Sequence, residues 1–202
     1  MSRFRRDAQA GFSLIELMIS MVLGLLVATL AFWAVGAYNR LVRLRSDAVR
    51  AFSALDNVVA VQPALIKAGQ LEGRDGVDAH AGIEMAAWSR LEAAAGQFAQ
   101  ALSNARARPL DAEHLRAFST AYDVLTNAWR APEADGLDAV LNPRDLRARL
   151  AGLDEQAVAL AAAFDTTVAA YNMAIRQFPA VILAGVWHFR TAEPLAWNRS
   201  VA

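Results

Sequence analysis

A long apolar run near the N-terminus limits what this chain can fold into more than any other feature. Residues 11–38 read GFSLIELMISMVLGLLVATLAFWAVGAY, and after Glu16 they include no charged side chain. A helix needs about 20 mostly apolar residues to cross the hydrocarbon core of a bilayer. The run therefore predicts a single transmembrane helix over residues 12–38, with membrane lipid around it.

A secretory signal or a lipoprotein anchor fits the run less well than a retained helix does. A cleaved secretory signal has an apolar core of about 7–15 residues that ends at a small-residue cleavage site, and this run is longer. A lipoprotein anchor needs a cysteine, and the chain has none. Arginines flank the run on both sides: Arg3, Arg5 and Arg6 before it, and Arg40, Arg43, Arg45 and Arg50 after it. The positive-inside rule counts both flanks, so charge leaves the orientation undecided.

The rest of the chain is long enough for one soluble domain. About 165 residues remain, which can bury a core without metals or disulfides. The 20 basic and 20 acidic residues cancel, and no long block of one sign occurs, so the chain lacks the basic face that nucleic acid requires. We therefore expect no nucleic-acid partner. The absence of cysteine excludes disulfides, thiolate metal sites and thiol catalysis.

Beyond the membrane run the hydrophobic pattern is helical, and no alternating run predicts a strand. The first helix should continue out of the membrane to Gly69, with a kink at Pro63. Asp111 can cap the start of the third helix, and the pair Asn142-Pro143 marks the start of the fourth. Short loops between long helices favour antiparallel packing. We predict an all-α fold, in which an N-terminal transmembrane helix continues into an antiparallel bundle of about four long helices.

Apolar stripes at steps of three and four residues predict which faces of these helices are buried. The second helix carries Met85, Trp88, Leu91, Ala95, Phe98, Leu102 and Ala105. The fourth carries Leu146, Leu150, Leu153, Ala157, Leu160, Phe164, Val168, Tyr171, Ile175 and Phe178. Asp154 and Asp165 also lie on the fourth helix, and we expect both on its solvated face.

The fourth helix should lead back to the membrane, where the apolar segment FPAVILAGVWHF follows over residues 178–189. We expect the chain to end near the bilayer. The segment should pack on the bundle as ordinary core, because exposed apolar segments are usually folded against something. The alternative is that Trp187 and Trp197 lie at the membrane interface, where a tryptophan ring is buried while its N–H stays hydrated.

Two blocks of sequence carry a family resemblance. Residues 38–56, YNRLVRLRSDAVRAFSALD, follow the membrane run directly, and residues 169–189, AAYNMAIRQFPAVILAGVWHF, lie near the C-terminus. Their order and spacing resemble the LemA family. The positions that carry the resemblance are Tyr38, Asn39, Tyr171, Asn172, Ile175, Phe178, Pro179, Ala184 and Gly185. The resemblance implies a membrane-anchored helical bundle over residues 39–190, followed by a tail at 191–202, and it leaves the biochemical role undefined.

The first residues of the chain carry a second resemblance. The segment RRDAQAGFSLIELM, residues 5–18, resembles a type IV prepilin leader. This resemblance implies that prepilin peptidase removes a short basic leader, residues 1–11, by cutting between Gly11 and Phe12, and that Phe12 is then N-methylated. It also implies that Glu16 pairs with the amine of a neighbouring subunit. The alternative for Glu16 is a place at the cytoplasmic edge, where its carboxylate reaches the headgroups.

These observations favour a non-enzymatic scaffold or interaction protein of the bacterial envelope. It would be a single-pass, LemA-like bundle in the inner membrane, and the leader, if it works as in pilins, places the soluble domain in the periplasm. Its partner would be another envelope protein or a second copy of the chain. The alternative is a minor pilin-like or pseudopilin-like subunit of a type IV pilus or type II secretion system. Such subunits are expected to carry a β-sheet head, for which the sequence shows no strand pattern.

We expect neither catalysis nor a cofactor. The three histidines, His80, His114 and His188, fall in separate segments without the repeated carboxylate spacing of a metal site. The sequence has no phosphate-binding glycine loop and no G-x-S-x-G elbow. The histidines should therefore lie at the surface or at helix ends.

Overall fold

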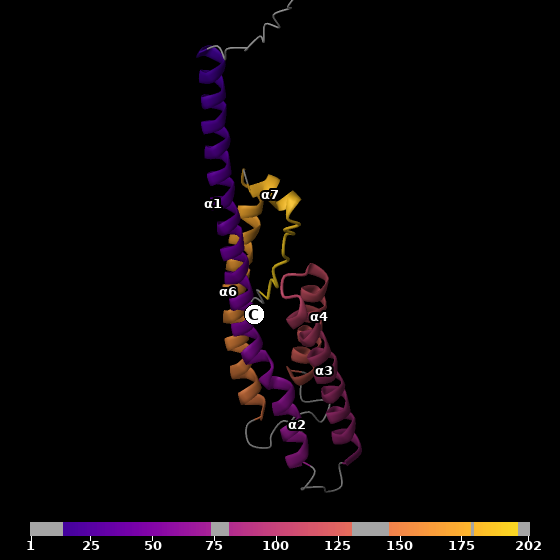
Figure 1. Ribbon diagram of the computed structural model, residues 1–202. Helices are drawn as coiled ribbons and strands as arrows, with labels where there is room; N and C mark the ends of the chain where they lie inside the picture. The colour runs from indigo at the N-terminus through magenta and orange to yellow at the C-terminus, as the bar shows by residue number, and fades with distance from the viewer. Residues whose placement is uncertain (1–13, 74–80, 131–145, 179, 198–202) are drawn as a thin grey trace, which may run out of the picture.

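The computed structural model describes residues 14–73, 81–130, 146–178 and 180–197, and the regular secondary structure in these ranges is entirely helical (Figure 1). The helices are α1 (Leu14–Val59), α2 (Val61–Gly73), α3 (Ala81–Ala107), α4 (Ala112–Arg130), α6 (Leu146–Arg176) and α7 (Ala180–Val186). No strand occurs in the described part of the chain. The prediction of an all-α fold is confirmed.

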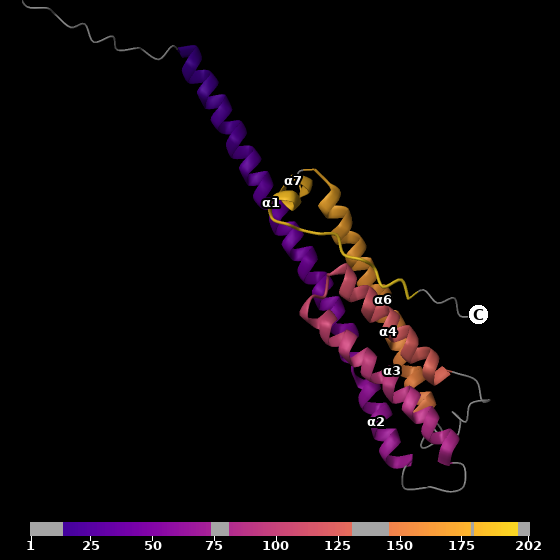
Figure 2. The ribbon, with the colours of Figure 1, turned by 90° about the vertical axis from the view of Figure 1, so that its right-hand side faces the viewer.

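Helix α1 is 46 residues long, and its N-terminal half stands clear of the bundle (Figures 1 and 2). By length and composition, two helical stretches could cross a membrane: α1 with its continuation into α2, and α6. In the apolar window of the first stretch no residue is buried, whereas 33% of the window in α6 is buried inside the bundle. Of these two stretches, α1 therefore carries the exposed apolar surface, and α6 is a core helix of the bundle.

Helices α1 and α2 form one long helix that is interrupted at Ala60. Pro63 has no N–H to donate to the carbonyl of Val59, and its ring crowds that carbonyl. The N–H of Ala60 still donates to the carbonyl of Asp56 at 2.9 Å, so the helix is broken only locally. The sequence predicted a kink at Pro63, and the structure has its break three residues earlier, at Ala60.

The predicted helix end at Gly69 is wrong, because α2 continues to Gly73. Gly69 is instead a point of close contact with α6. A Cβ atom at Gly69 would lie 2.7 Å from Cδ2 of Leu146, so glycine allows the two helices to approach. Gly69 therefore allows α2 to pack closely on α6 and does not mark the end of the helix.

The bundle consists of two antiparallel helix pairs (Figures 1 and 2). Helix α6 runs back along the C-terminal half of α1, and α3 and α4 form a hairpin beside this pair. Helix α2 packs mainly on α3, and α7 lies across the membrane-side end of α6 against α1. The antiparallel arrangement agrees with the prediction.

Buried aromatic rings join the two pairs. Phe52 of α1 lies 5.9 Å from both Phe118 of α4 and Phe164 of α6, measured between ring centroids. Phe98 of α3 lies 5.6 Å from both Phe118 and Tyr122. All five rings are buried. Burial of each ring contributes about 1.5–3 kcal/mol, so this aromatic layer is a main source of the bundle's stability.

The buried stripe of α6 differs from the predicted stripe at its centre. Leu153 and Leu160 are only half-buried, and their neighbours Asp154 and Ala161 take the buried positions. The steps from Leu150 through Asp154, Ala157 and Ala161 to Phe164 alternate four and three, which keeps these residues on one face. The remaining predicted positions are buried except Phe178: Leu146, Leu150, Ala157, Phe164, Val168, Tyr171 and Ile175.

Met85 and Phe178 are exposed, against the prediction, at 69% and 66% of their surface. The buried stripe of α3 runs through Ala87, Leu91 and Phe98, and Met85 falls on the other side of that helix. Phe178 lies beyond the end of α6 at Arg176, so the helical spacing no longer applies to it.

The chain reverses after α7. His188 has a left-handed backbone conformation, with φ at 56°, and the N–H of Phe189 donates to the carbonyl of Ala184 at 3.0 Å. This pattern closes the helix as a Schellman-type cap does. The following residues run back along the bundle, away from its membrane-side end (Figure 1). The described residues end at Trp197. The end of the chain lies outside the described residues, so the expectation that it lies near the bilayer stays a prediction.

The apolar segment 178–189 packs on the bundle only in part, against the expectation that it forms ordinary core. Ala180, Leu183 and Ala184 are buried, whereas its larger apolar residues are exposed, namely Phe178, Val181, Ile182, Val186 and Trp187.

The tail that follows this segment does pack on the bundle. Ala192, Leu195 and Trp197 are buried. The ring of Trp197 stacks on Tyr122 at 4.0 Å, and its Nε1 donates a 2.8 Å hydrogen bond to Oγ of Ser119. The alternative that Trp197 lies at the membrane interface is therefore wrong, because its ring and its N–H both have partners inside the bundle.

Candidate functional site

The N-terminal signal leads directly into the exposed part of α1. The predicted processing residues Gly11 and Phe12 lie outside the described residues. Glu16 lies in the first turn of α1 with its side chain exposed, where a negative charge complements the positive end of the helix dipole. Its pairing with a neighbouring subunit stays a prediction.

The uncharged part of α1 is long enough to cross a bilayer. Residues 17–39 contain no charged side chain, and Glu16 and Arg40 flank this run. At about 1.5 Å per residue the run extends about 35 Å, which exceeds the hydrocarbon core of about 30 Å.

The structure brings together Tyr38 and Tyr171, two of the family-motif residues. Both line a cleft of 660 Å³ between α1, the turn from α3 to α4, and the segment after α7. Tyr38 contacts the rings of Trp187 and Phe189 at 5.6 and 6.1 Å. Burial raises the pKa of Tyr171, and the positive charge of Arg45 partly opposes this. The motif tyrosines thus lie at the membrane-side end of the bundle.

Asn172 and Asp165 hold the tail in place. The Asn172 amide donates to the carbonyl of Ala192 at 2.8 Å and accepts from the N–H of Ala192 at 3.0 Å. The Asp165 carboxylate accepts from the N–H groups of Leu195 and Ala196 at 2.6 and 2.9 Å. Asp165 was expected on a solvated face, and this is wrong because the returning tail covers it.

The other family-motif residues have separate positions. Asn39 is exposed on α1, and Pro179 lies outside the described residues. Phe178 makes an edge contact with Trp33 of α1 at 5.1 Å between centroids.

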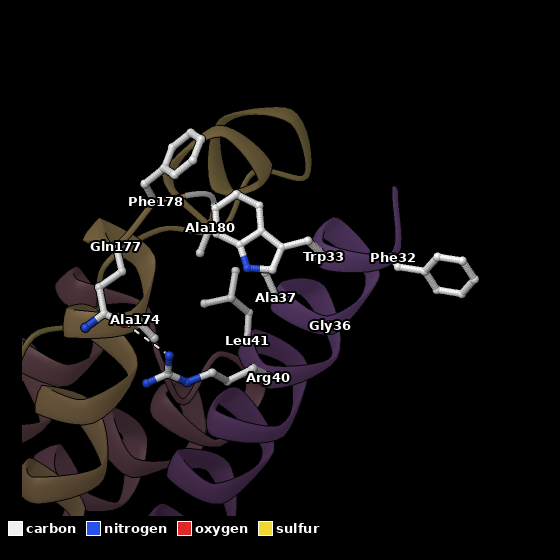
Figure 3. A pocket seen from close by; sticks show the side chains of 10 residues that line it. All are labelled: Phe32, Trp33, Gly36, Ala37, Arg40, Leu41, Ala174, Gln177, Phe178 and Ala180. Carbon is white, nitrogen blue, oxygen red and sulfur yellow. Dashed lines mark hydrogen bonds between the residues drawn. The ribbon is translucent and has the colours of Figure 1, made fainter. Parts of the chain in front are cut away.

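Phe178 belongs to a small notch beside the last turns of the uncharged run of α1 (Figure 3). The notch has a volume of 330 Å³ and lies between α1, the end of α6 and the start of α7. The rings of Trp33 and Phe178 lie on one side, and Arg40 and Gln177 lie on the other (Figure 3). Nη1 of Arg40 donates to Oε1 of Gln177 at 3.1 Å.

Trp33, Arg40 and Gln177 were not predicted as site residues from the sequence. Trp33 and Arg40 are seven residues apart, and this spacing places them on the same face of α1. Spacing alone does not show that Gln177, 137 residues further along the chain than Arg40, meets this face.

A buried polar cluster ties together α2, α4 and α6. The hydroxyl of Tyr122 donates to Oδ1 of Asp154 at 2.8 Å and accepts from Nε2 of Gln62 at 3.3 Å. Arg130 forms an ion pair with Oδ2 of Asp154. Asp154 is only 4% exposed, so its predicted place on a solvated face is wrong. A buried carboxylate with two such partners serves to fix the helices relative to one another.

The described residues hold no group of three or more His, Asp or Glu side chains that could bind a metal ion. Asp111 caps α4 as predicted, since its Oδ1 accepts from the N–H groups of Glu113 and His114 at 3.1 and 3.2 Å. Its side-chain bond with the His114 ring at 2.7 Å, together with these backbone bonds, lowers the pKa of Asp111. His188 is exposed at the end of α7, and His80 lies outside the described residues.

Comparison with known proteins supports the N-terminal signal. The family described as "Prokaryotic N-terminal methylation motif" matches residues 6–32, a range that includes Gly11, Phe12, Glu16 and most of the exposed part of α1. No curated protein and no solved structure matches the chain, and the comparisons give the LemA resemblance no support. The motif implies processing by prepilin peptidase and, with the apolar helix, a location in the membrane of the cell envelope. The chain therefore joins a prepilin-type N-terminus to an all-helical bundle.

Proposed function

We propose that this protein is a single-pass anchor of the bacterial inner membrane whose helical bundle lies in the periplasm and acts as a LemA-like scaffold. The observation that best supports this proposal is the difference between the two halves of α1. Its N-terminal half exposes no charged side chain beyond Glu16, and its C-terminal half supplies Leu41, Phe52 and Leu55 to the bundle core. One continuous helix would thus connect the bilayer to the domain.

Prepilin-type export supports the periplasmic placement. A leader that works as in pilins places the domain in the periplasm, so Glu16 would lie on the cytoplasmic side and Arg40 on the periplasmic side. The bundle begins at Leu41, directly beyond the proposed membrane edge.

The first test is intact-mass analysis of the membrane-extracted protein, produced with and without prepilin peptidase. The expected result is loss of residues 1–11 and addition of a methyl group at Phe12, only in the presence of the peptidase. A Gly11→Val variant is the control and should stay at full length. An unprocessed wild-type chain would refute the export route.

The proposed activity is binding rather than catalysis. The grouped polar side chains that the bundle offers, such as the cluster around Asp154, are engaged in holding helices together. The partner would be another envelope protein or a second copy of the chain. Cross-linking in native membranes, over a range of expression levels, should give dimers or a discrete larger product. A chain that remains monomeric at every level and captures no partner would contradict the scaffold role.

A second candidate, a minor pilin-like or pseudopilin-like subunit, is favoured by the methylation motif and by the exposed Glu16 at the start of α1. In this function Glu16 would pair with the methylated amine of a neighbouring subunit. The protein would then be recovered in a sheared pilus fraction, and Glu16→Gln would abolish that recovery. Its absence from this fraction, with normal processing, favours the scaffold.

A further inference from the structure

We infer that the notch between α1, α6 and α7 binds one phospholipid of the membrane leaflet from which the bundle emerges. The phosphate would lie at Arg40, and an acyl chain would lie against Trp33 and Phe178. This inference rests on α1 crossing the bilayer, as in the proposed function, but it is independent of the scaffold role.

The notch lies at the end of the uncharged run of α1, where the bilayer edge is expected. The uncharged residues 17–39 extend about 35 Å, enough for the hydrocarbon core of about 30 Å, and Arg40 follows them directly. Trp33 lies seven residues before Arg40, which is about 10 Å deeper along the helix at a rise of about 1.5 Å per residue. Headgroups extend roughly 5–7 Å beyond the hydrocarbon on each side. Trp33 therefore lies at the level of the acyl chains and Arg40 at the level of the phosphates.

The notch has an apolar side and a polar side. The rings of Trp33 and Phe178 form its apolar side, and Arg40 and Gln177 form its polar side (Figure 3). Arg40 uses one N–H to bind Gln177, and a guanidinium has five N–H donors in total. Arginine donors match the geometry of phosphate oxygens. The order of apolar and polar groups along α1 is thus the order of acyl chain and phosphate in a phospholipid.

The exposed face of α7 borders the notch and is apolar. Residues 178–187 contain no charged side chain. Between 48% and 66% of the surface of five large apolar residues in this segment is exposed: Phe178, Val181, Ile182, Val186 and Trp187. The opposite face, with Ala180, Leu183 and Ala184, is packed against the bundle. The exposed face lies beside α1 between the levels of Trp33 and Tyr38, so it continues the apolar surface of the transmembrane segment.

A lipid fits the notch because the apolar surfaces on both sides of it are continuous. These surfaces are the transmembrane part of α1 and the exposed face of α7, and the same leaflet would cover both. A lipid headgroup bound to Arg40 would occupy the polar side of the notch. Anionic lipids such as phosphatidylglycerol should bind best, because a basic side chain near the surface favours them by electrostatic attraction.

The test is native mass spectrometry of the full chain extracted in mild detergent and supplied with phosphatidylglycerol. The wild type should retain one lipid. Arg40→Gln should lower the lipid-bound fraction about fivefold, the loss expected for one basic side chain near a membrane surface. Arg43→Gln is the matched control, because Arg43 is exposed on α1 but does not line the notch.

A second pair of variants tests the apolar part of the notch without changing charge. Gly36 lines the notch, and a Cβ at this position meets no atom within 4 Å, so Gly36→Leu should fill the space and displace the lipid. Gly24→Leu is its control, since Gly24 lies on the same helix with equally open surroundings and away from the notch. Both changes replace a helical glycine, so neither should unfold α1.

Reduced retention in Arg40→Gln and Gly36→Leu, with normal retention in both controls, supports the site. Equal retention in all four variants overturns it. Binding of inorganic phosphate in place of the lipid, at the same Arg40-dependent level, also overturns it, because the notch would then be a simple anion site. The same spectra show whether the leader was removed, so a failure of the proposed export route is read separately from lipid retention.

Discussion

Tyr122 lies where interactions from several helices and the tail converge. Its hydroxyl joins Gln62 and Asp154, and its ring stacks on Trp197 and contacts Phe98. It thereby links α2, α3, α4, α6 and the tail through one side chain. A single substitution at Tyr122 should therefore lower the stability of the whole bundle.

We predict that Tyr122→Phe lowers the free energy of unfolding by about 1–3 kcal/mol, because Asp154 loses a hydrogen-bond donor in a site that water does not reach. Urea titration of the detergent-solubilised protein, followed by circular dichroism, measures the change. Tyr171→Phe is the matched control, since the described residues show no hydrogen bond to the Tyr171 hydroxyl. Equal losses in the two variants would contradict the role given to the Tyr122 hydroxyl.

At the scale of elements, the tail is held by side chains of α6 rather than by a helix of its own. Asp165 and Asn172 bind its backbone. Trp197 of the tail is buried against Tyr122 and Ser119 of α4. Segments held by so few contacts open more easily than the core.

We predict that Asp165→Ala releases residues 195–197 while leaving the helices intact, since two backbone N–H groups lose their acceptor. Hydrogen exchange should become faster at Leu195 and Ala196, and the fluorescence of Trp197 should shift toward that of a hydrated indole. Glu155→Ala, at an exposed position of the same helix, should change neither signal. Unchanged exchange in Asp165→Ala would show that the apolar contacts alone hold the tail.

Two helical glycines should respond in different ways to substitution by alanine. Gly96 of α3 is exposed, and a Cβ there meets no atom within 4 Å, so Gly96→Ala should raise the free energy of unfolding by about 0.5–1 kcal/mol. Gly69→Ala should give no such gain, because its Cβ would lie 2.7 Å from the buried Leu146 side chain. Urea titration of both variants checks this. A similar gain at Gly69 would mean that α2 and α6 can separate without cost.

At the scale of the whole molecule, the membrane segment and the bundle have separate roles. The buried core begins at Leu41, whereas the large apolar side chains from Leu14 to Val35 are exposed. Folding of the bundle should therefore not require the membrane segment, although the two share one helix.

We predict that residues 39–202, produced without the membrane segment, form a helical domain with a cooperative thermal transition. Circular dichroism gives the helical content and the melting curve. A non-cooperative melt, or a loss of helix beyond the deleted residues, would show that the transmembrane half of α1 stabilises the bundle.

The helical class and the buried stripe of α4 were predictable because they depend on local spacing. Leu115, Phe118, Tyr122, Leu125 and Trp129 are all buried as a regular amphipathic helix requires. Asp154 was misplaced because its charge suggested a solvated face, although it lies four residues after Leu150 and three before Ala157. Its partners Tyr122 and Arg130 come from another helix, and no local pattern shows them.

The sequence by itself determined the features that arise within one helix or one short signal. These are the membrane segment, the prepilin-type motif, the helical class and the cap at Asp111, since each depends on residues only a few positions apart. Only the tertiary structure decided where the tail goes, that Asp154 and Asp165 are covered, and that Trp33 and Arg40 meet Phe178 and Gln177 in a notch. These contacts join residues far apart in the chain, so they follow from how the helices pack and not from the spacing within any of them.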